Sequence, residues 1–157
     1  IVRNPKLKVI LTVSPIRHVR DGMHANQLSK AALLLAIDQL HAVFPEHVFY
    51  FPAYELLLDE LRDYRFYADD MVHPSPQAVR YVWDKFVQTC LSEDALEIMQ
   101  ESENINKALS HKPFHPESDE HKRFLGQIVL KIDRLNKKYP YLDFQNEKEI
   151  CHIQLKQ

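Results

Sequence analysis

Two short apolar runs with one long apolar helical segment between them constrain the fold of this chain more than any other feature of its sequence. Residues 7–13 are rich in β-branched and aliphatic side chains and lie between two turn-forming dipeptides, which is typical of a parallel strand covered on both faces. Residues 47–51 form a second strand-like run, and Pro52 ends it because proline has no backbone donor for a central ladder. A strand, a crossover helix and a second strand predict a right-handed β-α-β unit in a parallel sheet.

The helices of this part of the chain are indicated by the residues at their ends. Ser29 has the side chain of an N-cap, and the apolar helix that follows is expected to end near Phe44, just before a proline. Residues 54–61 also have a helical pattern. A further helix is expected after Ser75 and Pro76, which suit the N-cap and the first helical position.

In the last part of the chain the pattern changes to long amphipathic helices. Apolar residues recur on one helical face in residues 95–109 and again in residues 124–139, with a proline-containing break between them. We therefore expect an α/β part in residues 1–91 and a C-terminal helical hairpin in residues 92–157. The segment from Glu149 to Leu155 is expected to form a short terminal strand.

Charge, cysteine content and hydropathy exclude several classes of function. A formal net charge of -2, from 20 Lys and Arg against 22 Asp and Glu, gives no general attraction to nucleic acid or to an anionic membrane. No run approaches the roughly 20 apolar residues that span a bilayer. Cys90 and Cys151 fit neither a zinc spacing nor a disulfide scaffold, so we expect a protein of the reducing cytoplasm. His111, His115 and His121 match no standard metal-binding spacing, and neither a metal nor a cofactor is expected.

A carboxylate and an imidazole three residues apart, Asp70 and His73, are the candidate catalytic residues. A histidine held by a carboxylate through one ring nitrogen presents the other nitrogen as a base in a fixed tautomer. That arrangement suits the activation of a nucleophilic hydroxyl. The alternative is that two such residues near a helix start only cap the helix or pair at the surface. A His-Pro-Ser-Pro turn that opens a helix follows directly and favours the catalytic interpretation.

The candidate substrate-binding residues lie in two loops. In open α/β sheets, ligands bind beyond the carboxyl ends of the strands, where Ser14 and Arg17 follow the first strand. We expect Ser14 and His73 to share a cleft at this edge. Arg65, in an aromatic and arginine-rich connector, is a third candidate. The alternatives are a Ser-Pro turn for Ser14, a solvated side chain for Arg17 and a pair with a neighbouring carboxylate for Arg65.

The pattern Asp70-x-x-His73-Pro74 before a helix resembles the last motif block of the SGNH hydrolases, a superfamily of serine esterases and acyltransferases. Four further segments resemble, in their amino-acid sequence, the GSCFA family, an SGNH-like bacterial group: residues 10–18, 26–30, 50–55 and 61–67. The similarity runs from about residue 9 to residue 86. The Gly-Ser-Cys-Phe-Ala motif that names the family does not occur in this sequence, and Ala78 stands where many SGNH relatives carry glycine. We therefore interpret the chain as the C-terminal part of a longer protein.

The resemblance implies an SGNH or flavodoxin-like three-layer fold, of which this chain holds part of the parallel sheet. It also implies esterase or acyltransferase chemistry, in which His73 takes the proton of a serine and Asp70 orients the imidazole. Asp69 is the neighbouring carboxylate, and the spacing favours Asp70. The implied substrate is an ester-bearing small molecule or glycan. The rival hypothesis is a non-catalytic binding or assembly module with a structural Asp-His pair, in which the C-terminal helices carry a partner interface. A homo-oligomer formed through these helices is one form that this interface could take.

Overall fold

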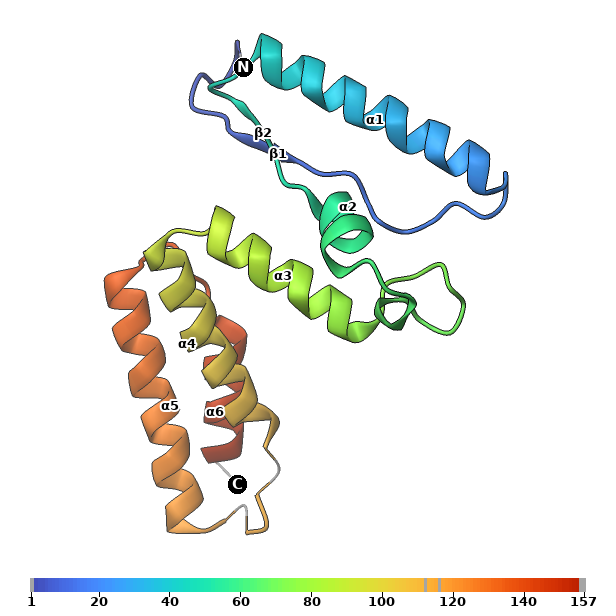
Figure 1. Ribbon diagram of the computed structural model, residues 1–157. Helices are drawn as coiled ribbons and strands as arrows, with labels where there is room; N and C mark the ends of the chain where they lie inside the picture. The colour runs from blue at the N-terminus through green and yellow to red at the C-terminus, as the bar shows by residue number, and fades with distance from the viewer. Residues whose placement is uncertain (1, 112, 116, 156–157) are drawn as a thin grey trace. The chain divides into compact units, whose positions relative to one another are not determined.

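The computed structural model describes residues 2–111, 113–115 and 117–155, and the chain divides into two compact units, residues 1–90 and 91–157. The first unit combines a small parallel sheet with helices, and the described residues of the second unit are helical with connecting loops (Figure 1). The chain is therefore mostly helical, and its sheet has two strands in the part that the structure describes.

The predicted β-α-β unit is confirmed. It consists of β1 (Val9–Leu11), α1 (Met23–Val43) and β2 (Val48–Tyr50). The two strands are parallel, with Val9 opposite Val48 and Leu11 opposite Tyr50. In Figure 1, α1 runs alongside both strands. Its His41 holds the outer side of β2, because the ring Nδ1 lies 2.6 Å from the carbonyl oxygen of Val48.

The start of α1 differs from the prediction, because the helix begins at Met23 and Ser29 lies inside it. The N-cap is Gly22, which has φ 85° and makes no side-chain cap. Its carbonyl oxygen accepts the N–H of Asn26 at 3.0 Å, the first bond of the helix. Glycine adopts this left-handed conformation without a Cβ clash, so the chain turns into the helix earlier than the serine suggests.

The sheet is covered unequally on its two faces. On one face Val13 and Val48 are buried, whereas on the other Ile10 and its partner Phe49 are 44% and 40% exposed. The prediction of a strand covered on both faces is wrong for this second face. The physical reason is that the described residues pack loosely there and leave an apolar cavity between Ile10 and a later helix.

After β2 the first unit continues with the helix α2 (Ala53–Glu55), the π-helical turn η1 (Leu56–Leu61), the 3-10 turn η2 (Tyr64–Phe66) and the helix α3 (Pro76–Cys90). Arg62 ends η1 in a left-handed conformation, φ 47°, and its N–H bonds the carbonyl oxygen of Leu57 five residues back. The predicted cap of α3 is confirmed, since the hydroxyl of Ser75 accepts the N–H of Ala78 at 3.3 Å. Phe86 on α3 meets Phe51 edge to face, with ring centroids 5.1 Å apart.

The second unit is built from α4 (Glu93–Ser110), α5 (Asp119–Lys138) and α6 (Gln145–Leu155), which lie side by side in Figure 1. The predicted amphipathic helices appear as α4 and α5, capped by the hydroxyls of Ser92 and Ser118. Their apolar faces meet in one core with these buried members: Ile105, Leu125, Ile128, Ile132, Leu135, Tyr139, Phe144 and Cys151. The terminal strand expected at residues 149–155 is wrong. These residues belong to α6, where the fully buried Cys151 packs into this core, and tertiary packing outweighs the short β-like pattern.

No helix among the described residues combines the length and the hydrophobicity that a bilayer-spanning segment needs. Cys90 and Cys151 are free thiols, and burial raises the pKa of the Cys151 thiol.

Candidate functional site

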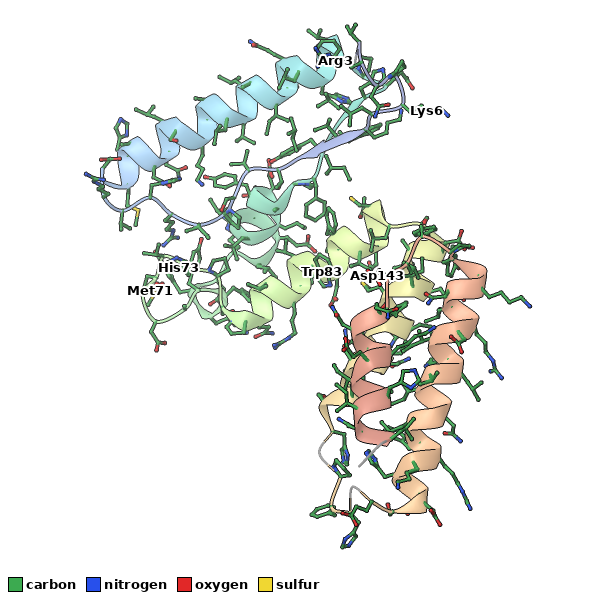
Figure 2. The ribbon with its side chains drawn as sticks, turned by 180° about the vertical axis from the view of Figure 1, so that it is seen from behind. Arg3, Lys6, Met71, His73, Trp83 and Asp143 are labelled. Carbon is green, nitrogen blue, oxygen red and sulfur yellow. The ribbon has the colours of Figure 1, made fainter. Side chains whose placement is uncertain are left out.

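The candidate site lies on the loop that joins η2 to α3. An antiparallel bridge between Tyr67 and Pro74 closes this loop at its base, and the N–H of Ala68 donates to the carbonyl oxygen of His73 at 2.8 Å. Figure 2 labels Met71 and His73 on this loop, just before α3. The loop is therefore a closed turn with defined backbone bonds.

Within this turn Asp70 holds His73 through both carboxylate oxygens. Asp70 Oδ2 lies 2.6 Å from Nδ1 of His73. Asp70 Oδ1 accepts the backbone N–H groups of Val72 and His73, each at 2.9 Å. The carboxylate thus fixes both the backbone that carries the imidazole and the orientation of the ring.

The same hydrogen bonds set the charge of the pair. The backbone N–H of His73 contributes most, followed by its ring and the N–H of Val72, and together they lower the pKa of Asp70 to about 2. Asp70 is therefore ionised at neutral pH. The side chains of His73 and Asp70 are 58% and 49% exposed, so the pair is open to solvent and to a ligand.

The geometry is that of an imidazole which can act as a base. A carboxylate that accepts from Nδ1 favours the tautomer with the proton on Nδ1, and Nε2 is then a free acceptor. Among the described residues, no side chain hydrogen-bonds to Nε2 of His73. The described chain therefore presents an oriented base, and the hydroxyl that would lose its proton to this base is not supplied by any described serine.

Arg17, from the loop after β1, contacts the turn that carries the pair. Its Nη1 donates to the carbonyl oxygen of Met71 at 2.9 Å, and its backbone N–H donates to that of Val72 at 3.3 Å. Its guanidinium carbon lies 4.1 Å from the ring centroid of Tyr67 and 5.6 Å from that of Tyr64. The structure thus brings this loop and the Asp70–His73 turn together.

Ser14 and Arg65 have other partners in the structure. The hydroxyl of Ser14 accepts the N–H of Ile16 at 3.3 Å, as a serine does in a local turn. Arg65 pairs with Asp63 at 3.1 Å, and its side chain is 71% exposed. The described contacts join neither residue to His73. Substrate-binding roles for Ser14, Arg17 and Arg65 stay predictions.

Two buried residues of α1 that the sequence did not single out for the site hydrogen-bond to the loop that carries Arg17. Asn26 and Lys30 are 5% and 2% exposed, although most of the helix around them is more open. Asn26 Oδ1 accepts the N–H of His18 at 2.9 Å, and Lys30 Nζ donates to the carbonyl oxygen of Ser14 at 2.6 Å. Burial lowers the pKa of Lys30. The available signal was two polar residues one helical turn apart in an apolar helix.

An apolar cavity of about 430 Å³ lies beside the site, between the open face of the sheet and α3. Ile10, Phe51, Trp83 and Phe86 line it, and Pro74, the residue after His73, is on its wall. Figure 2 labels Trp83 on α3. The cavity is almost free of polar groups, so it suits apolar matter rather than an ion.

The described part of the chain offers no clustered set of His, Cys, Asp and Glu side chains suited to a metal ion.

Comparison with known proteins gives two family matches. Residues 2–86 match the GSCFA family, and residues 102–157 match a family described as GSCFA domain protein, C-terminal domain. No curated protein and no solved structure gives a significant match.

Proposed function

The chain belongs to the GSCFA family, and from this premise we propose that it supplies the Asp-x-x-His half of a serine esterase or acyltransferase site of the SGNH type. The observation that carries the proposal is the 2.6 Å contact between Asp70 Oδ2 and His73 Nδ1. The same carboxylate binds the backbone of the turn, so the ring is held in one orientation before any ligand arrives.

In the proposed reaction, Nε2 of His73 takes the proton of a serine hydroxyl as the oxygen attacks the ester carbonyl. The resulting imidazolium donates this proton to the leaving alkoxide, and an acyl-serine is formed. Water, or a second alcohol in an acyltransferase, then gives its proton to Nε2 as its oxygen attacks the acyl carbonyl. The imidazolium returns this proton to the serine oxygen, which leaves as the free hydroxyl. Asp70 remains ionised throughout, which its pKa of about 2 supports.

We further propose that the two strands belong to a larger parallel sheet of the three-layer SGNH type. Parallel sheets are usually buried on both faces, and two strands alone are marginal. The small size of the sheet supports further strands in another part of the protein, and the exposed face that carries Ile10 and Phe49, with the apolar cavity beside it, supports a further layer that covers this face. The serine and the donors for the oxyanion would come from that part.

The proposed substrate is an ester-bearing small molecule or glycan. We propose that its acyl group is transferred in the cytoplasm without the help of a cofactor. The exposure of the pair supports a bulky substrate, since the side chains of His73 and Asp70 are 58% and 49% exposed and no described side chain hydrogen-bonds to Nε2. Neither nucleic acid nor a membrane is part of the proposal.

The test is labelling of the longer protein that contains this chain by a fluorophosphonate, which reports an activated serine without knowledge of the substrate. We expect labelling in the unchanged protein, loss of labelling in His73→Ala, and full labelling in His24→Ala. His24 is an exposed histidine on α1 and serves as the matched control. Labelling that survives in His73→Ala would contradict the proposed role of this base.

A second candidate function is a non-catalytic assembly module in which Asp70 and His73 only shape their turn. Exposed apolar side chains on the C-terminal helices favour it, because Leu130 and Ile153 are 59% and 54% exposed. A homo-oligomer formed through these helices would bury them. Light scattering measures the molar mass of the chain and of its Leu130→Glu variant. An oligomer that dissociates in the variant supports the assembly module, and a monomer in both cases would contradict it.

A further inference from the structure

We propose that Arg17 is a positioning residue, which fixes the turn carrying Asp70 and His73 instead of binding an anionic group of the substrate.

The turn needs such support because its backbone is strained at its tip. Met71 has φ 59°, in the left-handed region that residues with a Cβ rarely adopt. The bonds that shape the tip lie within the turn: Met71 N–H to the carbonyl oxygen of Ala68 at 2.9 Å, and the two N–H groups bound by Asp70. These bonds define the shape of the turn but do not attach it to the sheet.

Arg17 supplies the attachment. It donates to two consecutive carbonyl oxygens, those of Met71 and Val72, at 2.9 and 3.3 Å. These carbonyls belong to the Met71–Val72 and Val72–His73 peptide groups, whose N–H groups are the ones that Asp70 accepts. Asp70 therefore binds the N–H groups of this short segment while Arg17 binds its carbonyl groups, and a segment held on both sides has little freedom to rotate the imidazole.

The guanidinium is itself held in place by aromatic rings. It lies over Tyr67 at 4.1 Å and near Tyr64 at 5.6 Å, distances at which a cation is attracted to a ring face. Tyr67 also belongs to the base of the same loop, because its backbone is bridged to Pro74. The ring, the guanidinium and the turn thus form one closed arrangement.

Arg17 differs in this respect from the other arginine considered for substrate binding. Arg17 is half-buried and its guanidinium is engaged with a carbonyl oxygen and two rings. Arg65 is exposed and pairs with Asp63, a residue outside the turn. Arg65 is therefore the matched control for the loss of a positive charge from this region.

The first test measures the geometry of the turn in the 157-residue chain, by carbon-detected NMR titration of the Asp70 carboxyl group. Its pKa of about 2 depends on hydrogen bonds from His73 and Val72, and Arg17 is not among its causes. A change in this pKa therefore reports whether the turn still holds together. In Arg17→Met we expect it to rise by about 1 unit or more toward the ordinary value near 3.9, and in Arg65→Met we expect no change.

A second variant covers the case in which Arg17→Met does not fold. Tyr67→Leu removes the ring under the guanidinium but keeps the backbone bridge, and we expect it to raise the pKa of Asp70 in the same direction. Tyr67→Phe keeps the ring and should leave this pKa unchanged. Folded Arg17→Met or Tyr67→Leu variants whose Asp70 pKa stays within about 0.3 units of the unchanged chain would overturn the inference.

The catalytic consequence rests on the proposed function. In the longer protein, Arg17→Met should lower kcat for an ester substrate at least about tenfold with little change in KM, because a loosened base acts on the transition state. A large rise in KM with unchanged kcat would instead show a substrate ligand and overturn the inference. The NMR titration needs no ester reaction. An unchanged titration with fluorophosphonate labelling intact would refute the positioning role alone, and absent labelling would refute the proposed function alone.

Discussion

Replacing Asp70 by Asn separates the proposed catalytic role of the Asp70–His73 pair from its structural role in the turn. The amide oxygen of Asn can still accept the N–H groups of Val72 and His73, which Asp70 Oδ1 accepts at 2.9 Å. The turn should therefore keep its shape. What changes is the atom that faces Nδ1 of His73 at 2.6 Å, because the acceptor Oδ2 becomes an NH2 donor.

The size of the effect follows from this exchange. A donor opposite Nδ1 moves the ring proton to Nε2, and a protonated Nε2 cannot take the proton of a serine. In a buried Ser-His-Asp triad the same change lowers kcat by about 10⁴. Here the two side chains are 58% and 49% exposed, so water can partly support the active tautomer. We therefore expect a loss of roughly 10² to 10⁴ in kcat with KM nearly unchanged.

The assay is hydrolysis of p-nitrophenyl acetate by the proposed longer protein that joins this chain to the serine-bearing part, with Asp69→Asn as the matched control. Asp69 is an exposed neighbour, and the described contacts give it no bond to His73. Asp69→Asn should keep activity within about twofold, since surface changes away from a site are usually mild. Equal losses in both variants, or full activity in Asp70→Asn, would refute the assignment of Asp70 as the orienting carboxylate.

Three further predictions concern the 157-residue chain itself. The chain alone should not sustain turnover of p-nitrophenyl acetate, because no described serine hydroxyl contacts His73; turnover that disappears on mutating one of its own serines would contradict this. The Asp70 carboxyl should titrate near pH 2, below its ordinary value near 3.9. Its depressed pKa means that its contribution to stability is present above that ordinary value and is lost as the pH falls toward 2, and an NMR midpoint near 3.9 would speak against the observed hydrogen bonds. Ile132→Ala, at a fully buried position, should lower the stability of the C-terminal unit by about 2–5 kcal/mol, whereas Leu130→Ala should cost about 0.5 kcal/mol. Thermal unfolding followed by circular dichroism compares them, and equal shifts would refute the assigned faces of α5.

Local patterns in the sequence were enough for the elements whose signals are short-range. The two strand-like runs, the Ser75-Pro76 helix start and the amphipathic faces of α4 and α5 each depend on neighbouring residues, and each appears in the structure. The spacing of Asp70 and His73 likewise predicted a pair, because a carboxylate three residues before a histidine in a turn can reach both its N–H and its ring.

The remaining features depend on contacts between distant segments, which a single sequence does not reveal. Arg17 bonds the carbonyl group of Met71, 54 residues further along the chain, through a backbone atom that every residue type possesses. The sequence of residues 149–155 favours a strand, whereas the helix α6 is decided by its packing against α4 and α5. The early start of α1 depends on the conformation of Gly22, which leaves no side-chain signature comparable to a capping serine.

The apolar cavity between the sheet and α3 affects how dye-binding measurements on this chain should be interpreted. Ile10, Val79 and Trp83 are 44%, 55% and 51% exposed, although the elements that carry them are regular. A dye such as ANS is expected to bind there and to fluoresce with the native chain, a signal that is commonly taken as evidence of a molten globule. Trp83 is the single tryptophan and lines the cavity, so energy transfer from it to the dye would locate the bound molecule. Dye fluorescence together with a native near-UV circular dichroism spectrum, which a molten globule lacks, would then mark a folded chain with an unfilled apolar surface.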